Sequence, residues 1–222
     1  MENNEYKAVK VWDWQTRILH WFNAILIITL AILAFGFEIA KELGMPKQGR
    51  GVLKEIHAII GYFFVATFTL RILWGFLGNE YARWGDIIPY HREKWQMIGS
   101  HIKWYLSGFK AKPPIIPGHN PVASLFYIFL FIILISQVIT GLTLAGLAFD
   151  FFPGSLFFSG WSEGAKEALE DVAEEIHEFG FFFIILFLVA HIGGLVVHEI
   201  GEKTGLFSSM IHGRKYLPKD GD

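Results

Sequence analysis

Residues 122–149 read VASLFYIFLFIILISQVITGLTLAGLAF, and this stretch, which carries no charge, decides the fold class. At a helical rise of about 1.5 Å per residue, such a run is long enough to cross a hydrocarbon layer of about 30 Å. Further apolar runs predict spanning helices at about 18–37, 57–77 and 177–198, with Arg71 as a single charge inside the second. The sequence therefore predicts an all-α integral membrane protein, one domain over residues 1–222 built as a four-helix bundle.

The composition of the whole chain agrees with this prediction. Of 222 residues, 53% are hydrophobic and only 18% are charged, which is too little charge for a water-facing surface and excludes a soluble enzyme. A net charge of -2 gives no basic footprint and excludes a nucleic-acid binder. Cysteine is absent, which excludes disulfides, iron-sulfur clusters and covalently attached haem. The polar N-terminus before the first span does not read as a cleavable signal.

Four spans place both termini on one side, and the balance of Lys and Arg predicts which side this is. The terminal segments and the loop at 78–121 hold Lys7, Lys10, Arg17, Arg83, Arg92, Lys94, Lys103, Lys110, Lys112, Lys203, Arg214, Lys215 and Lys219. The opposite loops hold only Lys41, Lys47, Arg50, Lys54 and Lys166. Both termini are therefore expected to be cytoplasmic.

The two long loops differ in character. The inner loop, residues 78–121, mixes aromatic and basic residues, which is typical of interfacial amphipathic helices. At its end, Asn120 and Pro121 are predicted to be the cap and first residue of the third span. The outer loop, residues 150–176, is strongly acidic and is predicted to include a short helix at 162–176. This acidic stretch is either a docking surface for a partner or simply the solvated face of that helix.

Histidines in or beside apolar spans are the main functional candidates, because ionisable groups are costly there. His177 and His191 are fourteen residues apart on the fourth span, which puts them within about 40° of one face and about 21 Å apart along it. His57 lies at the outer level of the second span, and His20 lies at the inner level of the first. This layout predicts two bis-histidine haems, because zinc requires three or four ligands at one point.

The sequence allows alternative roles for several of these histidines and for residues near them. His198 is an alternative to His191, because it lies on the same face near the inner rim. Any single histidine can also be a hydrogen-bonded core residue. Arg17 and Arg71 are candidate partners of haem propionates, although Arg71 can equally extend to the membrane interface. Small residues at Gly61 and Gly141 give room for a flat group or for close helix packing. His119 is close to the predicted inner site, while the expected surface histidines are His91, His101 and His212.

The placed histidines and their neighbours resemble the b-type cytochrome subunit of membrane-bound nickel-iron hydrogenases, within the prokaryotic dihaem cytochrome b superfamily. The resemblance covers most of the chain. Its motifs are Val11-Trp12-Asp13, Arg17-Ile18-Leu19-His20-Trp21, Ile56-His57, Arg71-Ile72-Leu73-Trp74, Gly118-His119-Asn120-Pro121, Ile139-Thr140-Gly141, Ile176-His177, Ala190-His191 and residues 209–215. Each motif is weak alone, but together they are specific.

The resemblance implies two haem b groups with iron ligands His57 and His177 toward the outside and His20 and His191 toward the cytoplasm. It also implies a quinone near the inner haem and, as partner, the iron-sulfur small subunit of a periplasmic hydrogenase. The chain would then be the electron-transfer subunit of a quinone-reducing respiratory complex, and the resemblance implies that the membrane is the inner membrane of a bacterial or archaeal cell. Rival hypotheses are a formate or thiosulfate system as partner, a stand-alone quinol oxidoreductase, and a haem-free membrane anchor.

Overall fold

The computed structural model describes residues 6–108 and 115–219, so residues 109–114 of the predicted inner loop lie outside the described part. Helices dominate this part, with a short strand near each end. The elements in chain order are β1 (Tyr6–Lys10), α1 (Trp14–Glu42), α2 (Lys47–Leu77), α3 (Trp84–Ile87), α4 (Arg92–Leu106), α5 (Pro121–Phe149), α6 (Gly154–Phe158), α7 (Glu163–Glu202), α8 (Leu206–His212) and β2 (Arg214–Pro218).

Four of these helices, α1, α2, α5 and α7, are long and apolar enough to cross a membrane, with mean hydropathies of 2.2, 1.7, 2.6 and 2.6 in their most apolar windows. Their outward faces carry large apolar side chains such as Ile32, Phe63 and Val189, each more than 60% exposed. Such faces suit lipid, where a helix satisfies all of its own backbone hydrogen bonds. The four predicted spans and the all-helical membrane fold are confirmed.

The helices extend beyond the predicted spans, most clearly at the end of α1, the start of α2 and the start of α7. The structure has the helix predicted at 162–176 within the acidic loop, but not as a separate short helix, because α7 begins at Glu163 and continues without a break to Glu202. No proline interrupts this stretch, and Lys166 pairs with Glu163 at 2.9 Å on its first turn. An ion pair between residues three apart stabilises the first turn of the helix. The same helix then continues past residue 176. The remainder of the loop contains α6.

The described chain forms two compact units. The first, the inner unit, consists of residues 1–20, 70–129 and 187–222, and the second, the outer unit, consists of residues 21–69 and 130–186. Each of the four long helices contributes residues to both units. A functional residue is therefore described below within its own unit.

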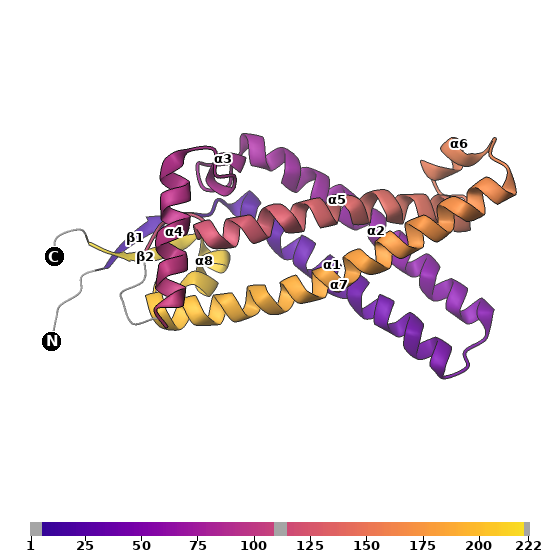
Figure 1. The fold of residues 1–222 in the computed structure, drawn as a ribbon, viewed down its shortest axis with the longest axis horizontal. Coiled ribbons are helices and arrows are strands. Elements are labelled where there is room, and N and C mark those ends of the chain that lie inside the picture. Colours follow the sequence, from indigo (N-terminus) through magenta and orange to yellow (C-terminus); the bar gives the residue numbers. More distant parts are fainter. Residues whose placement is uncertain (1–5, 109–114, 220–222) are drawn as a thin grey trace. The chain divides into compact units, whose positions relative to one another are not determined.

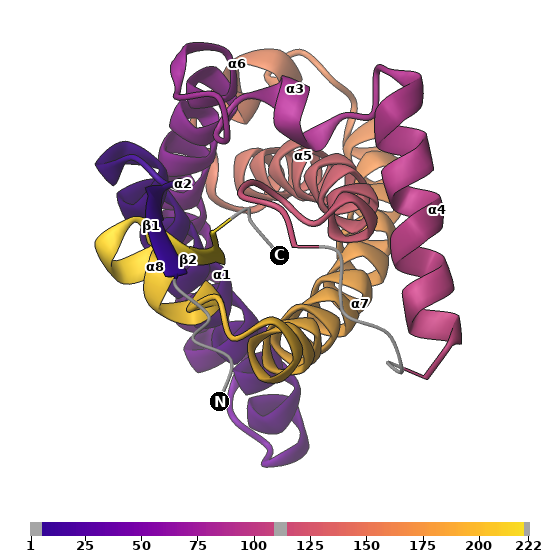
Figure 2. The same cartoon turned by 90° about the vertical axis from the view of Figure 1, so that its left-hand side faces the viewer.

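In the inner unit, the two ends of the chain are tied together. β1 pairs antiparallel with β2, from Tyr6 opposite Pro218 to Lys10 opposite Arg214, and Figure 1 shows the two strands beside the chain ends. Figure 2 shows α8 next to this strand pair. The buried indole of Trp12 donates a hydrogen bond to Ser209 Oγ on α8 at 3.1 Å. These contacts join residues 6–12 to residues 209–218 within the inner unit.

Helix α4 is the main element of the loop between α2 and α5, and it is amphipathic as predicted. It buries Ile98, His101 and Trp104 and exposes Arg92 and Lys103. It lies across the C-terminal end of α7, where Trp104 packs 5.5 Å from the ring of His198 (Figure 1). The predicted start of α5 is also confirmed, because Asn120 Oδ1 accepts hydrogen bonds from the first free amides of the helix at 2.9 and 3.1 Å.

In the outer unit, α5 and α6 approach each other backbone to backbone at Gly146 and Gly154. A Cβ atom at Gly146 would overlap the Cα of Gly154, and backbone atoms cannot move aside as a flexible side chain does. Gly146→Ala is therefore expected to lower the free energy of unfolding by about 1–3 kcal/mol, the usual cost of overpacking. Thermal denaturation in detergent measures this. Gly36→Ala is the control, because a Cβ there meets nothing within 4 Å, and equal midpoints for the two variants would contradict the close contact.

Candidate functional site: two histidine pairs

The inner unit brings His20 of α1 and His191 of α7 together, and we call these two residues the inner pair. Their ring centres are 6.4 Å apart, with planes inclined at 47°. Aromatic side chains surround His191, because Phe187 stacks on its ring at 5.6 Å and Tyr127 of α5 meets it at 6.1 Å. One helical turn separates Phe187 from His191, so α7 itself supplies the stacking ring.

The outer unit brings His57 of α2 and His177 of α7 together, and we call these two residues the outer pair. Their ring centres are 6.2 Å apart, with planes inclined at 72°. Phe37 contacts the ring of His57 at 5.4 Å. Helix α5 contacts His177: Thr140 Oγ1 lies 2.8 Å from His177 Nδ1. The four histidines predicted from sequence are thus assembled two by two.

The spacing within each pair fits a single metal ion held from both sides. Two imidazoles that bind one ion at nitrogen–metal distances of about 2.0 Å have ring centres roughly 6 Å apart. A pair supplies only two ligands, which suits a metal whose remaining positions are filled by a planar macrocycle. Gly141 of α5 faces the outer pair, since a Cβ there would lie 3.3 Å from His177 Cε1. A Cβ at Gly61 would meet nothing within 4 Å, so that side of α2 is open.

His198, the alternative to His191, belongs to a separate hydrogen-bonded group of the inner unit. Its Nε2 lies 2.5 Å from Tyr105 Oη and 3.3 Å from Asn120 Nδ2. Its Nδ1 contacts the carboxylate of Glu202 one turn further along α7. Both ring nitrogens of His198 therefore have protein partners, whereas His191 faces His20.

The two arginines lie near the inner pair but differ in their contacts. Arg17 donates to the carbonyl oxygen of Ile211 and, through Nε at 3.3 Å, to that of Asp13, so it joins α1 to α8. Arg71 of α2 places its guanidinium carbon 5.7 Å above the ring of Trp84. Arg71 is thus held by a protein aromatic ring inside the inner unit, and the sequence did not indicate this contact.

One of the three expected surface histidines is buried. His91 and His212 are exposed, but His101 is only 1% exposed, which corrects that prediction. His101 lies on the buried face of α4 with Ile98 and Trp104, and its Nδ1 is 2.9 Å from the carbonyl oxygen of Met97. The helical periodicity of α4, with buried residues three apart, accounts for its position.

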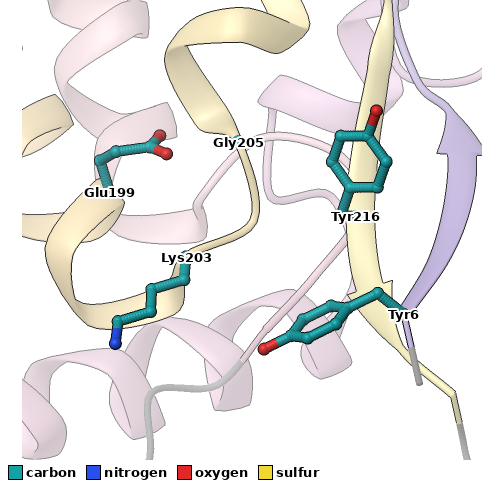
Figure 3. A pocket seen from close by; sticks show the side chains of 5 residues that line it. All are labelled: Tyr6, Glu199, Lys203, Gly205 and Tyr216. Carbon is teal, nitrogen blue, oxygen red and sulfur yellow. The ribbon is translucent and has the colours of Figure 1, made fainter. Parts of the chain in front are cut away.

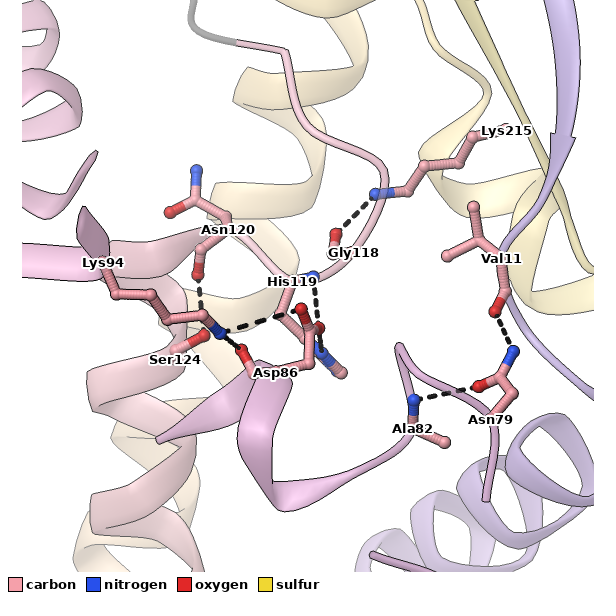
Figure 4. Close-up of polar contacts among 10 residues, drawn as sticks. All are labelled: Val11, Asn79, Ala82, Asp86, Lys94, Gly118, His119, Asn120, Ser124 and Lys215. Carbon is pink, nitrogen blue, oxygen red and sulfur yellow. Dashed lines mark hydrogen bonds and ion pairs between the residues drawn. The ribbon is translucent and has the colours of Figure 1, made fainter. Parts of the chain in front are cut away.

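A cluster of charged residues beside the inner pair was not predicted. We call it the inner polar cluster, and its members are Asp86, Lys94, His119 and Lys215 (Figure 4). Asp86 accepts hydrogen bonds from the backbone amide and Nδ1 of His119 at 2.9 and 2.6 Å. Lys94 lies 3.7 Å from the same carboxylate. Figure 4 also shows Lys215 donating to the carbonyl oxygen of Gly118, at 2.9 Å.

This cluster reaches the inner pair through aromatic contacts. The ring of His119 lies 4.8 Å from Trp12 and 5.5 Å from Tyr127, and Tyr127 in turn meets His191. The glycine at 118 is required here, because a Cβ on it would overlap the carboxylate of Asp86. His119 is thereby placed one aromatic ring away from the inner pair.

Burial and pairing act against each other in the inner polar cluster, and the net result is a lowered pKa for Asp86, His119 and Lys215. Burial raises the pKa of Asp86, but the hydrogen bonds from His119 outweigh this and hold the pKa below its ordinary value. Burial lowers the pKa of His119, although its bond with Asp86 opposes the effect. Burial lowers the pKa of Lys215 to about 8, against the attraction of Glu202 and Asp86. At neutral pH the cluster therefore holds an ionised Asp86 beside a neutral His119.

Asp86→Asn is expected to lower the free energy of unfolding at pH 7 by about 2–3 kcal/mol, because it removes the charge from two part-buried hydrogen bonds. The folded-state pKa of Asp86 is lowered, so this contribution is complete above the ordinary value of 3.8 and is lost as the pH falls through the folded-state value. Thermal denaturation at pH 7 and below pH 4 measures it, with the variant and wild type converging in acid. Glu93→Gln removes an exposed carboxylate of α4 as a control. A constant difference at all pH values would contradict the assignment.

A separate pocket of about 400 Å³ lies at the end of α7, next to the strand pair. It is lined by Tyr6, Glu199, Lys203, Gly205 and Tyr216, and Figure 3 shows the two tyrosines facing it from the strands. None of these five residues belongs to a histidine pair or to the inner polar cluster. The pocket is open and shallow, and the site described above does not depend on it.

Four membrane-spanning helices with two facing histidine pairs define a membrane protein of the cytochrome b kind. Comparison with known families agrees: a family model described as prokaryotic cytochrome b561 matches residues 11–213, so the chain belongs to this family. A b-type cytochrome is a haem protein, and the four histidines are the residues that fit haem iron.

Curated relatives resemble the chain over most of its length. One is the "probable Ni/Fe-hydrogenase B-type cytochrome subunit" of Bradyrhizobium diazoefficiens, 29% identical over 94% of this chain and 86% of the relative. The protein of the same name in Cupriavidus necator is 28% identical over 93% and 86%. The "probable Ni/Fe-hydrogenase 1 B-type cytochrome subunit" of Escherichia coli K12 is 28% identical over 91% and 88%.

Proposed function

We propose that this protein is a dihaem cytochrome b that carries electrons between an extracytoplasmic nickel-iron hydrogenase and the quinone pool of the membrane. The observation that carries the proposal is the spacing of the histidine pairs, at 6.2 and 6.4 Å between ring centres. Each pair has the geometry of two axial ligands on one iron. Two such centres within one chain form a relay for single electrons.

His57 and His177 hold the outer haem in this proposal, and His20 and His191 hold the inner haem. His191 is preferred to His198 because its ring faces His20, while both ring nitrogens of His198 contact other protein groups. Haem iron supplies the one-electron redox chemistry. If two histidines hold each iron, no position would be left for a substrate, so the protein's own part would be to hold and insulate the carriers.

Arg71 and Arg17 are the proposed cationic partners of the inner haem propionates. Arg71 lies in the same unit as His20, and its guanidinium carbon lies 5.7 Å from the ring of Trp84. Arg17 follows Asp13 by one turn of helix and lies three residues before His20 on α1. Charge-assisted hydrogen bonds from a guanidinium are well suited to carboxylates.

The outer end of α7 is the proposed docking surface for the hydrogenase. Its first four turns expose Glu163, Glu167, Glu170, Asp171, Glu174 and Glu175. Lys54 of α2 pairs with Glu174 at 3.6 Å, and the other acidic groups face solvent. This surface precedes the outer pair on the same helix, and the relatives are named as hydrogenase subunits, which supports a partner here. Opposite charge on the partner would direct its docking.

The quinone is proposed to react beside the inner pair, near His20, His119 and the aromatic residues of the inner loop. The inner polar cluster supports this location, because it places titratable groups one aromatic ring from His191. Both termini then lie in the cytoplasm, which the excess of Lys and Arg on that side predicts. The strand pair β1–β2, which holds the two ends together, agrees with termini on one side.

Hydrogen-driven reduction of a quinone tests this proposal. The complete complex is purified in detergent, supplied with hydrogen and a soluble quinone, and followed by haem absorbance and quinol formation. Reduction of haem b followed by quinol formation is expected. A preparation that contains no haem b would support the haem-free anchor instead. Reduction by formate or thiosulfate, but not by hydrogen, would assign the protein to another partner.

A further inference from the structure

Three residues of α5 form one face against His177, and we call them the α5 cradle: Gln137, Thr140 and Gly141. Their spacing of three and four residues places them on the same side of the helix. Gln137 Nε2 donates to the carbonyl oxygen of His177 at 3.1 Å, and Thr140 Oγ1 lies 2.8 Å from His177 Nδ1. A side chain on Gly141 would press on His177 Cε1 at 3.3 Å. The cradle thus contacts the backbone and one ring nitrogen of the same histidine, and Gly141 leaves room for its ring.

The hydroxyl of Thr140 has a second hydrogen bond that fixes its direction. Thr140 is 7% exposed, and its Oγ1 lies 2.8 Å from the carbonyl oxygen of Ser136, one turn earlier on α5. A carbonyl oxygen only accepts, so the single hydroxyl proton is used there. Toward His177 the hydroxyl oxygen must then accept. The proton of the imidazole therefore lies on Nδ1, and the lone pair lies on Nε2.

Gly180 of α7 lies opposite Gln137 of α5, and the hydrogen bond from Gln137 to His177 depends on close packing of these two helices. A Cβ on Gly180 of α7 would overlap the amide of Gln137. Gly180 follows His177 by three residues, so it lies on the same face of α7. The small residue allows Gln137 to reach the carbonyl oxygen of His177. Both the histidine's backbone and its ring are therefore held from α5.

We propose that Thr140 is a positioning residue for the outer haem, which fixes the tautomer of His177 so that Nε2 is presented to the iron. This inference rests on the proposed function, because it requires haem at the outer pair. A hydrogen bond accepted from Nδ1–H makes the ligating nitrogen more basic and favours the ferric state. Thr140 thereby lowers the reduction potential of the outer haem and tightens its binding.

The test uses Thr140→Val in the full-length, haem-loaded protein, with redox titration of the haem absorbance and electron paramagnetic resonance of the ferric state. The variant is expected to raise the midpoint potential of one haem and to weaken its retention about 10–100-fold, as for other partners of metal ligands. The second haem is expected to be unchanged, because His191 is flanked by Phe187 and Tyr127 in the other unit. Comparison with His57→Ala identifies the affected haem as the outer one.

Two further variants separate positioning from packing. Thr140→Ser keeps the hydroxyl and is expected to restore the wild-type potential. Thr143→Val is the matched control, because Thr143 Oγ1 donates to the carbonyl oxygen of Ile139 in its own helix, at 2.9 Å, and within the described residues it has no hydrogen bond to either histidine of the outer pair. Its potentials are expected to match those of the wild type. Should Thr140→Val not fold, Thr140→Ala is read by the same criteria.

The outcomes are distinguishable from failure of the proposed function. If the wild-type protein holds no haem at the outer pair, the proposed function fails, and the role of Thr140 fails with it. If both haems are present and neither the potential, the resonance signal nor haem retention changes in Thr140→Val, only the role of Thr140 is overturned. A shift of equal size in Thr143→Val would also overturn it.

Discussion

His191→Ala is expected to reduce the haem b content from two to one per chain, leaving the haem of the outer pair in place. Removal of one of two axial ligands leaves the inner haem tied to the protein by His20 alone. The two pairs belong to different units of the described chain, so the loss is expected to stay local. The pyridine haemochrome assay on purified protein measures the haem content, and low-temperature spectra show which haem remains.

His198→Ala is the matched control, because it changes a histidine seven residues further along the same helix. It removes the contacts with Tyr105 and Glu202, and both haems are expected to remain. The opposite result, with one haem lost in His198→Ala and both kept in His191→Ala, would reverse the assignment of the inner ligand.

His57→Ala is expected to remove the outer haem and to stop reduction of the inner haem by the hydrogenase. Without the outer carrier, an electron from the partner has no intermediate stop on its way to the inner pair. Dithionite, a small reductant in solution, is still expected to reduce the remaining haem. Stopped-flow absorbance of the complex after addition of hydrogen, compared with addition of dithionite, measures both rates.

His91→Ala serves as the control for His57→Ala, since His91 is exposed at the start of α4. It is expected to keep both haems and the wild-type rate with hydrogen. Reduction of the inner haem by hydrogen at an unchanged rate in His57→Ala would mean that electrons enter elsewhere, and the proposed order of the two haems would be wrong.

The parts of the fold that depend on local chemistry could be predicted from the sequence. Runs without charge predicted the four membrane helices, and the cap at Asn120 predicted where α5 begins. Helical periodicity placed His177 and His191 on one face of α7. Each of these inferences needs only the residues of one segment. In the structure, the ring centres of His57 and His20 lie 6.2 and 6.4 Å from those of their predicted partners, His177 and His191.

The parts that depend on contacts between distant segments could not be predicted. Asp86 lies in a short polar stretch that reads as a loop, and only folding brings His119 onto its carboxylate. Lys215 reads as one of several basic residues of the tail, although it is 3% exposed and bonded to Gly118. His101 was expected at the surface because it lies in the predicted inner loop with its interfacial helices. Burial of such groups is a property of tertiary packing, which a single segment does not reveal.

Helix α7 begins earlier than the fourth span predicted at 177–198, and the reason is not a contact between distant segments. The acidic residues before Ile176 were predicted to form a separate short helix outside the fourth span, but hydrophilicity sets where a helix leaves the membrane and not where it ends. Helix formation continues as long as the backbone permits, and no proline or glycine interrupts residues 165–176. The docking surface proposed for the hydrogenase is therefore part of the same rigid element that holds His177.

The central claim, two haem groups held by two histidine pairs, is tested most directly by the haem b content of the purified wild-type chain. Protein is quantified by amino-acid analysis and haem by the pyridine haemochrome assay on the same sample. We expect two haem b per chain, with a redox titration that resolves two centres. A chain that folds and inserts into the membrane but contains no haem b would contradict the account, and a content of one would leave one of the two pairs without its assigned role.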